Sequence, residues 1–244
     1  MSSAQRRQDA HEAIADVDGW LLPGDVDKLY ELAFSVAGPI LEIGTFHGRS
    51  AIVMARALRD AGNPAPLVSL DVDPEALGVA GENLRRKGVA GQVTLVRGTL
   101  AAFFRAVSGF VPALVFVDGD HSAAGAARDL SALEPHVPDG GLLFLHDYAD
   151  VRDRDPAVEE FGVGEAVART WVGRQCEPLG VFGVGGLFRR RIGGPGSVDG
   201  ARRPPVVDLV WRDDVAMQFR QRIRWPLGRR LRRVMPRRRP ENAG

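Results

Sequence analysis

The sequence predicts an α/β protein with a doubly wound, mostly parallel sheet of seven strands, an antiparallel hairpin at one edge and a basic helical tail. Five short apolar runs alternate with segments of helical periodicity, which is typical of a parallel sheet covered by helices. Two further strand-like runs follow without a strong helix between them, which indicates the edge hairpin. A hydrophobic fraction of 45% and a charged fraction of 26% are ordinary for a globular protein.

The elements are expected in the following order. Residues 1–19 are polar and form either a frayed segment or a short leading helix. Apolar residues then recur at helical spacing over residues 26–36, and Gly38-Pro39 ends that helix. Asp73 before Pro74 predicts a helix start, because Asp caps a helix and proline suits its first turn. The apolar runs predict strands over residues 40–43, 67–70, 93–96, 113–117, 142–145, 174–179 and 185–190. The patterns between them predict helices over residues 50–59, 74–87, 122–134 and 156–171, and a short helix ending near residue 104.

Charge is distributed unevenly along the chain. The formal net charge is +1, but residues 189–244 contain sixteen arginines and five acidic residues, so this end carries +11 and the remainder −10. Glycine and proline are frequent just after the last predicted strand, which indicates a linker. We therefore divide the chain into an N-terminal extension (1–19), a main domain (20–190), a linker (191–206) and a basic tail (207–244).

The basic tail has an apolar stripe. Apolar side chains recur there every four residues, at Val207, Trp211, Val215, Phe219 and Ile223, which predicts an amphipathic helix. Three partners stay open: an anionic membrane surface, nucleic acid, and the acidic body of this chain or of a second copy in a homo-oligomer. Nucleic acid is the least favoured. One cysteine, no signal-like N-terminal segment and no membrane-length apolar run predict a cytoplasmic protein, with peripheral membrane association through the tail as an open extension.

A glycine turn follows the first strand, at the edge of the sheet where ligands usually bind. Its pattern is Glu42-x-Gly44-x-x-x-Gly48, so it lacks the triple glycine that holds a dinucleotide pyrophosphate, which disfavours a nicotinamide-dependent reductase. Asp71 ends the second strand, where a carboxylate can accept both hydroxyls of a ribose. A nucleoside without a diphosphate, such as S-adenosylmethionine, fits both features. In the simpler alternative, the glycines make a tight turn and Asp71 caps a helix.

Three segments, residues 42–50, 69–73 and 117–121, together resemble class I S-adenosylmethionine-dependent methyltransferases. The likeness covers roughly residues 20–190 and is greatest to the branch with macrolide-sugar O-methyltransferases and, more distantly, catechol O-methyltransferases. It implies a Rossmann-like methyltransferase sheet. The resemblance implies that Glu42 and Ser50 lie near the methionine part of the cofactor and that Gly44 and Gly48 let the backbone approach it. It implies that Asp71 binds the ribose and that adenine lies against Val72, Gly98 and Thr99. Asp118 would lie between the cofactor and the metal.

The fourth strand ends in Asp118-Gly-Asp-His121. Methyl transfer to an alcohol requires removal of the hydroxyl proton, which a divalent cation or a general base can assist. Asp118 and Asp147 follow strands four and five, and two carboxylates there suit a hard cation such as Mg²⁺. The resemblance implies that His121 is the general base and that Asp118 binds the metal. We expect Asp120 to cap the following helix.

His146 departs from the pattern of the metal-dependent branch, in which an acidic pair follows strand five. Here that pair is His146-Asp147. Asp118, Asp147 and His146 are the candidate metal ligands, and three interpretations stay open. The site uses fewer protein ligands and more water, His146 binds a softer ion such as Mn²⁺, or no metal binds and His146 is a second base or a substrate contact.

Together these features predict an S-adenosylmethionine-dependent methyltransferase, with His121 and Asp118 as catalytic residues. The expected reaction is O-methylation of a hydroxyl on a sugar or another small natural-product acceptor, with or without metal assistance. The alternative is a noncatalytic S-adenosylmethionine-binding or scaffold protein that associates with a membrane or partner through its basic tail.

Overall fold

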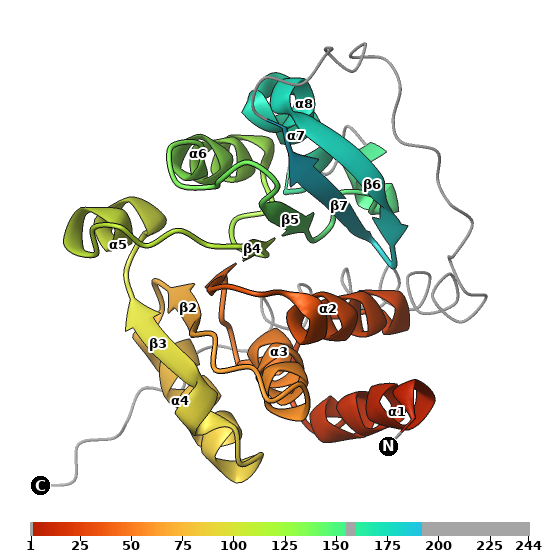
Figure 1. Ribbon diagram of the computed structural model, residues 1–244. Helices are drawn as coiled ribbons and strands as arrows, with labels where there is room; N and C mark the ends of the chain where they lie inside the picture. The colour runs from red at the N-terminus through yellow and green to blue at the C-terminus, as the bar shows by residue number, and fades with distance from the viewer. Residues whose placement is uncertain (1, 155–159, 192–244) are drawn as a thin grey trace, which may run out of the picture.

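The computed structural model describes residues 2–154 and 160–191, and its centre is one seven-stranded sheet (Figure 1). The strand order is β3-β2-β1-β4-β5-β7-β6. Strands β1 to β5 are parallel, and β7 runs antiparallel to both β5 and β6. This confirms the predicted sheet and its edge hairpin. The strands are β1 (Ile40–Ile43), β2 (Leu67–Asp71), β3 (Val93–Arg97), β4 (Leu114–Val117), β5 (Leu142–Leu145), β6 (Cys176–Phe182) and β7 (Gly185–Arg190).

Helices cover both faces of the sheet, as Figure 1 shows. On one side lie α1 (Ser3–Ile14), α2 (Pro23–Ser35), α3 (Arg49–Asp60) and α4 (Pro74–Arg86). On the other lie α5 (Leu100–Ala106), α6 (Ala123–Leu133), α7 (Val163–Arg169) and α8 (Trp171–Gln175). Two short 3₁₀ turns, η1 (Ala90–Gln92) and η2 (Val151–Arg154), complete the described elements.

The alternation of side chains along each strand explains the two cores. Phe116 and Phe144 pack into the core under α1, α2 and α3, whereas Val115 and Leu143 pack into the core under α6, α7 and α8. Successive strand residues point to opposite faces, so a strand covered by helices on both sides is apolar throughout. All four residues of β4 are buried, which is why this strand appears in the sequence as an unbroken apolar run.

Of the two alternatives for residues 1–19, the structure has the short leading helix. Helix α1 packs against the domain, with Ile14 buried and the Arg49 side chain donating to backbone carbonyls at and beyond its end. Two later elements differ from the sequence prediction. The helix expected over residues 156–171 is two helices, α7 and α8, separated at Thr170, and residues 155–159 lie outside the described ranges. Strand β6 begins two residues later than expected, because Gln175 still belongs to α8.

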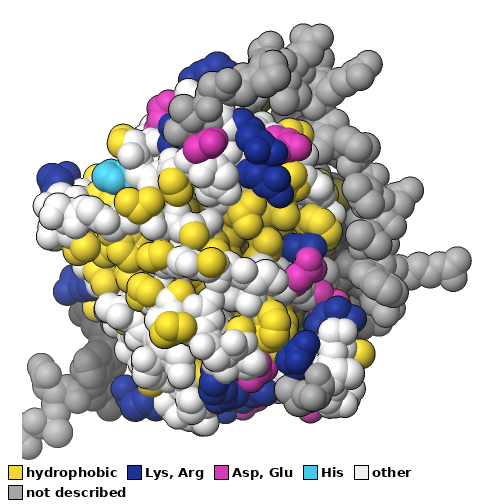
Figure 2. Space-filling view, viewed as in Figure 1, with side chains coloured by type: hydrophobic (Ala, Val, Ile, Leu, Met, Phe, Trp, Pro, Cys, Tyr) yellow, Lys and Arg dark blue, Asp and Glu magenta, His cyan; other side chains and the backbone are white. Residues whose placement is uncertain are grey.

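The two ends of the sheet differ in chemistry. At the amino ends of β1 and β2, Phe34, Val36, Asn63, Ala65 and their neighbours line an open groove of about 630 Å³ that has no titratable side chain in its lining. Figure 2, viewed as in Figure 1, shows hydrophobic side chains exposed across the middle of one face of the molecule. The carboxyl ends of β1, β2, β4 and β5 instead lead into the glycine turn and the predicted acids and histidines, so the site is built there.

None of the helices within the described ranges is long and apolar enough to cross a membrane. The linker beyond Arg191 and the basic tail of residues 207–244 lie outside the described residues, so the amphipathic helix stays a prediction.

Candidate active site

The glycine turn after β1 brings the backbone close to strand β4. Gly44 has φ +92°, and a Cβ there would lie 2.0 Å from the carbonyl oxygen of Asp118, so only glycine fits. Gly48 has φ +81° and is the N-terminal cap residue of α3. Strand order reverses between β1 and β4, and such a reversal is where open α/β sheets bind ligands. The turn therefore opens the start of α3 toward this crevice.

Asp71 holds this turn rather than capping the next helix. Its Oδ2 accepts a hydrogen bond from the backbone of Phe46 at 2.8 Å, and its Oδ1 accepts one from Asp73 at 3.0 Å. Asp73 is the cap of α4, accepting from the backbone of Glu75 at 2.8 Å. The simpler alternative of Asp71 as a cap is therefore wrong. Its carboxylate is fixed at the carboxyl end of β2, where it retains lone pairs for further hydrogen bonds.

Glu42 lies fully buried beneath the turn. Its two carboxyl oxygens are hydrogen-bonded to the hydroxyls of Ser50 and Ser69. Burial raises the pKa of Glu42 to about 8, reinforced by the charges of Asp118 and Asp71 and opposed by the two serines. Ser50, which the resemblance assigns to the methionine carboxylate, is bonded to Glu42 in this structure.

The remaining predicted cofactor contacts lie along the same edge. Val72 is 63% exposed directly after β2. The Gly98 N–H donates to the Asp71 carbonyl at 2.9 Å, and Thr99 caps α5 by accepting from Ala102 at 3.2 Å. The partly exposed ring of Phe46 stacks on His47, with the ring centroids 3.8 Å apart. These residues leave an apolar surface open next to Asp71.

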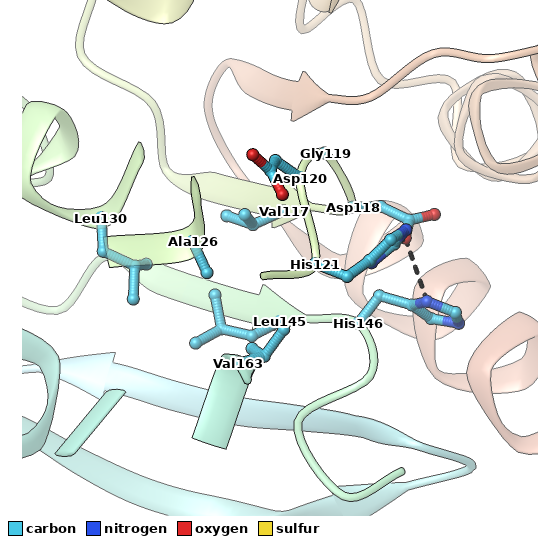
Figure 3. Close-up of a pocket in the computed structure, with 10 residues that line it drawn as sticks. All are labelled: Val117, Asp118, Gly119, Asp120, His121, Ala126, Leu130, Leu145, His146 and Val163. Atoms are coloured by element: carbon cyan, nitrogen blue, oxygen red, sulfur yellow. Dashed lines mark ion pairs between the residues drawn. The ribbon is translucent and has the colours of Figure 1, made fainter. Parts of the chain in front are cut away.

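Two acids and two histidines meet beyond β4 and β5. His121 Nδ1 lies 2.9 Å from Asp147 Oδ2 and 4.0 Å from Asp118 Oδ1. His146 Nδ1 lies 3.0 Å from Asp118 Oδ1 and 3.4 Å from Asp147 Oδ2. Figure 3 shows Asp118, His121 and His146 on one side of a small hollow and apolar side chains on the other. The structure thus brings together all four residues that the sequence placed at these strand ends.

The cluster combines one accessible imidazole with buried partners. The side chain of His121 is 37% exposed, whereas those of His146 and Asp147 are 6% and 5% exposed. Burial lowers the pKa of each histidine, but contacts with Asp147 and Asp118 outweigh it and raise both pKa values above the ordinary range. The pKa of Asp147 is lowered despite its burial, chiefly by the charge of His146. His121 is therefore the histidine that a substrate can reach.

Asp120 is not the cap of α6. That cap is Ser122, whose hydroxyl accepts from the backbone of Gly125 at 3.1 Å. Asp120 lies outside the helix, where it accepts from the Ser122 N–H at 3.1 Å and pairs with Arg128 at 3.2 Å. Both residues precede an apolar helical pattern and both are good caps, so the sequence prediction was displaced by two residues.

Two charged residues at the site, Arg152 and Asp25, were not predicted from the sequence. Arg152 binds Asp150 through two nitrogens, lies 3.6 Å from Asp147 Oδ1 and covers the Phe161 ring, which stacks on His121. Asp25 is fully buried in α2, with its Oδ2 3.5 Å from His146 Nε2. An acid in the first turn of a helix is common, and an arginine in a polar loop is equally so. Neither gives a sequence signal of its own.

A metal ion would have one ligand set in the described part of the chain. Single ligand atoms of Asp118, His121 and Asp147 lie within 4.8 Å of one another. This set takes in His121 and differs from the predicted Asp118, Asp147 and His146. Neither ring nitrogen of His146 makes a hydrogen bond of normal geometry, so its contacts with the acids are electrostatic.

Comparisons with known proteins agree with this geometry. A family described as a methyltransferase domain matches residues 41–148. The ribosomal protein L11 methyltransferase of Pelotomaculum thermopropionicum is 34% identical over 116 residues, covering 48% of this chain and 34% of its own length. The catechol O-methyltransferase of Mycobacterium tuberculosis is 40% identical over 81 residues, covering 33% of this chain and 36% of its own length. The chain thus spans about a third of the length of these curated relatives.

The fold is also found among solved structures. The O-methyltransferase from Bacillus cereus in complex with SAH superposes with a TM-score of 0.57 at 18% identity, covering 77% of this chain and 91% of that one. At this identity the likeness supports the fold alone. Together, the sheet order, the glycine turn and the sequence matches support a methyltransferase domain of the class I, S-adenosylmethionine-dependent type over residues 41–148.

Proposed function

We propose that this protein transfers a methyl group to a hydroxyl of a small-molecule acceptor, of the sugar or natural-product kind, with His121 as general base. The observation that carries the proposal is the His121–Asp147 contact of 2.9 Å at the carboxyl end of the sheet. One partner is accessible and the other is almost fully buried. An exposed imidazole held from behind by a buried carboxylate can accept a proton and be stabilised as the imidazolium.

The residues around the glycine turn fit S-adenosylmethionine. Asp71 offers a fixed carboxylate to ribose hydroxyls, Val72 offers an exposed apolar surface to adenine, and the start of α3 offers backbone N–H groups to a carboxylate. Gly44, Gly48, Gly98 and Thr99 shape the same crevice. Bound there, S-adenosylmethionine supplies an electrophilic methyl group on a sulfonium.

The chain's own side chains handle the acceptor proton. Because Nδ1 of His121 faces Asp147, Nε2 is the nitrogen that takes the hydroxyl proton. Asp147 keeps the ring oriented, and Asp118, 4.0 Å from the same Nδ1, adds negative charge that favours the imidazolium. The apolar wall of Val117, Leu145 and Val163 excludes water from one side of the hollow. Phe161, stacked on His121, restricts the ring further.

A divalent cation bound by Asp118, His121 and Asp147 would occupy the histidine proposed as the base. Asp118, His121 and Asp147 offer two oxygens and one nitrogen, a set suited to a borderline ion such as Mn²⁺. Such an ion would lower the pKa of a bound acceptor hydroxyl. A His121 that binds metal through Nδ1 loses its contact with Asp147, so the two arrangements exclude each other. We propose the metal-free arrangement.

A screen of acceptors tests whether the protein methylates a hydroxyl group and whether it does so without a metal ion. The protein is incubated with S-adenosylmethionine labelled in the methyl group and with sugar, polyketide, catechol and lipid-linked acceptors, each with excess EDTA or with Mn²⁺. We expect labelled product from at least one hydroxylated acceptor, at a rate that EDTA leaves unchanged. Transfer that requires the metal would favour the cation arrangement, and binding of S-adenosylmethionine without transfer to any acceptor would favour the scaffold alternative.

A further inference from the structure

We propose that Asp25 is a positioning residue of this active site, which acts on Asp118 and Asp147 through the ring of His146. Asp25 belongs to α2, on the chain before the first strand, and none of the sequence motifs includes it. The expected effect of Asp25 on kcat rests on the proposed function, whereas its expected effect on the orientation of the His146 and His121 rings does not.

Asp25 is held in place by its burial and by backbone hydrogen bonds to both carboxylate oxygens. It is fully buried. Its Oδ2 accepts from the backbone of Leu22 at 2.9 Å, and its Oδ1 accepts from Val184 at 3.1 Å and Gly185 at 3.0 Å. A Cβ on Gly183, which has φ +59°, would lie 2.5 Å from Oδ1. The turn between β6 and β7 is thus folded directly over this carboxylate, which has one orientation.

The His146 ring lies between this carboxylate and the site. Its Nε2 is 3.5 Å from Asp25 Oδ2, and its Nδ1 is 3.0 Å from Asp118 Oδ1. Figure 3 marks the second of these contacts. The negative charge of Asp25 favours an orientation of the His146 ring in which the Nε2–H group points at this carboxylate. In that orientation, the Nδ1 edge of the ring faces Asp118 and Asp147. In a metal site, an outer carboxylate orients a histidine ligand in the same way, and its loss costs about 10- to 100-fold in activity.

The series Asp25, His146, Asp147 and His121 then alternates acid and imidazole from the buried core to the accessible base. Each neighbouring pair is within 3.5 Å. The competing explanation is that Asp25 has only a structural role and holds α2 against the β6–β7 turn through hydrogen bonds from the backbone of Val184 and Gly185. That role would affect stability and leave the chemistry of His121 unchanged.

Asp25→Asn separates these explanations, because the amide oxygen can still accept from Val184 and Gly185 while the charge facing His146 is lost. Asp60→Asn is the matched control. Asp60 accepts from the Tyr30 hydroxyl at 2.7 Å and so links α2 to α3 away from the site. The readouts are kcat, the dissociation constant of S-adenosylmethionine by calorimetry, and the ring ¹⁵N and ¹H resonances of His146 and His121 by NMR without acceptor.

For Asp25→Asn we expect kcat to fall about 10- to 100-fold, cofactor affinity to stay within twofold and the resonances of both rings to shift. Asp60→Asn should lower the melting temperature alone. An Asp25→Asn protein with the kcat of the control and unshifted rings would overturn the proposal. A wild-type protein that methylates no acceptor would refute the proposed function, and the NMR comparison would still decide the role of Asp25.

If Asp25→Asn does not fold, His146→Gln tests whether Asp25 acts through the His146 ring, because this variant leaves the backbone hydrogen bonds of Asp25 in place. Glutamine lacks the two ring nitrogens, of which one faces Asp25 and the other faces Asp118. We expect the same fall in kcat and a shifted His121 ring. An unchanged kcat with an unshifted His121 would overturn the proposal.

Discussion

The imidazole of His121 and the carboxylate of Asp147 lie 2.9 Å apart although they follow different strands. Strands β4 and β5 pair in parallel with Val117 opposite Leu145, so the residues after both strands leave the sheet side by side. Asp147 has φ +58°, an uncommon conformation for a residue other than glycine. Backbone strain of this kind is frequent at functional sites, and here it accompanies a carboxylate turned toward the end of β4.

The rate of methyl transfer should increase with pH through the raised pKa of His121. Burial lowers this pKa, but Asp147 and Asp118 outweigh it, so the midpoint should lie above the ordinary histidine value of about 6.5. Because a general base accepts a proton only when it is deprotonated, the rate of methyl transfer should fall at pH values below the pKa of His121. Asp147→Asn removes one stabilising charge and should move the midpoint of kcat against pH to lower values. A midpoint that does not respond to Asp147→Asn would contradict the assignment.

Glu42 should make the free energy of unfolding depend on pH. Its folded pKa of about 8 exceeds the ordinary 4.5, so the folded protein binds this proton more tightly than the unfolded chain. The resulting stability is fully present below about pH 4.5 and is lost as pH rises toward 8, by up to about 1.4 kcal/mol per pH unit. Urea denaturation at pH 5, 7 and 9 measures it.

Glu42→Gln should remove most of this slope, because glutamine stays neutral at every pH. Glu31→Gln is the control, since the side chain of Glu31 is 64% exposed and pairs with neighbouring Lys28. Parallel pH profiles for wild type and Glu42→Gln would show that Glu42 is ionised in the folded protein at neutral pH.

Asp71→Asn should weaken S-adenosylmethionine binding about tenfold, or roughly 1.4 kcal/mol. The amide oxygen can replace one acceptor but not both, so a ribose hydroxyl loses its partner. Asp73→Asn is a matched control two positions later, because asparagine caps a helix as well as aspartate does. Calorimetry on both variants measures the difference. Equal affinities would remove Asp71 from the cofactor site.

The basic tail should bind anionic lipid. The full chain should float with vesicles containing phosphatidylserine, and a chain ending at Arg190 should not, because the truncation removes fourteen arginines. Neutral phosphatidylcholine vesicles are the control. Equal flotation of both chains would exclude the tail as a membrane contact and leave the acidic body, a second copy or nucleic acid as its partner.

The sequence was most informative where one physical signal dominates. Unbroken apolar runs located β4 and β5, and the polar residues that follow them located Asp118, His121 and the His146-Asp147 pair. It was less informative where two residues compete for one role, as Asp120 and Ser122 do at the start of α6. It gave no indication of Asp25, whose importance depends on a contact with the β6–β7 turn 160 positions later in the chain. Such contacts arise from the order of strands and leave no local pattern.

If His121 removes the acceptor proton, single-turnover methyl transfer in excess EDTA should be much slower for His121→Gln than for the wild type. His11→Gln is the control, because His11 also faces a carboxylate, that of Asp27, at 2.9 Å. We predict a loss of about 10²- to 10⁴-fold for His121→Gln, unchanged cofactor affinity, and wild-type rates for His11→Gln. A His121→Gln protein that transfers methyl groups at the wild-type rate would contradict the account.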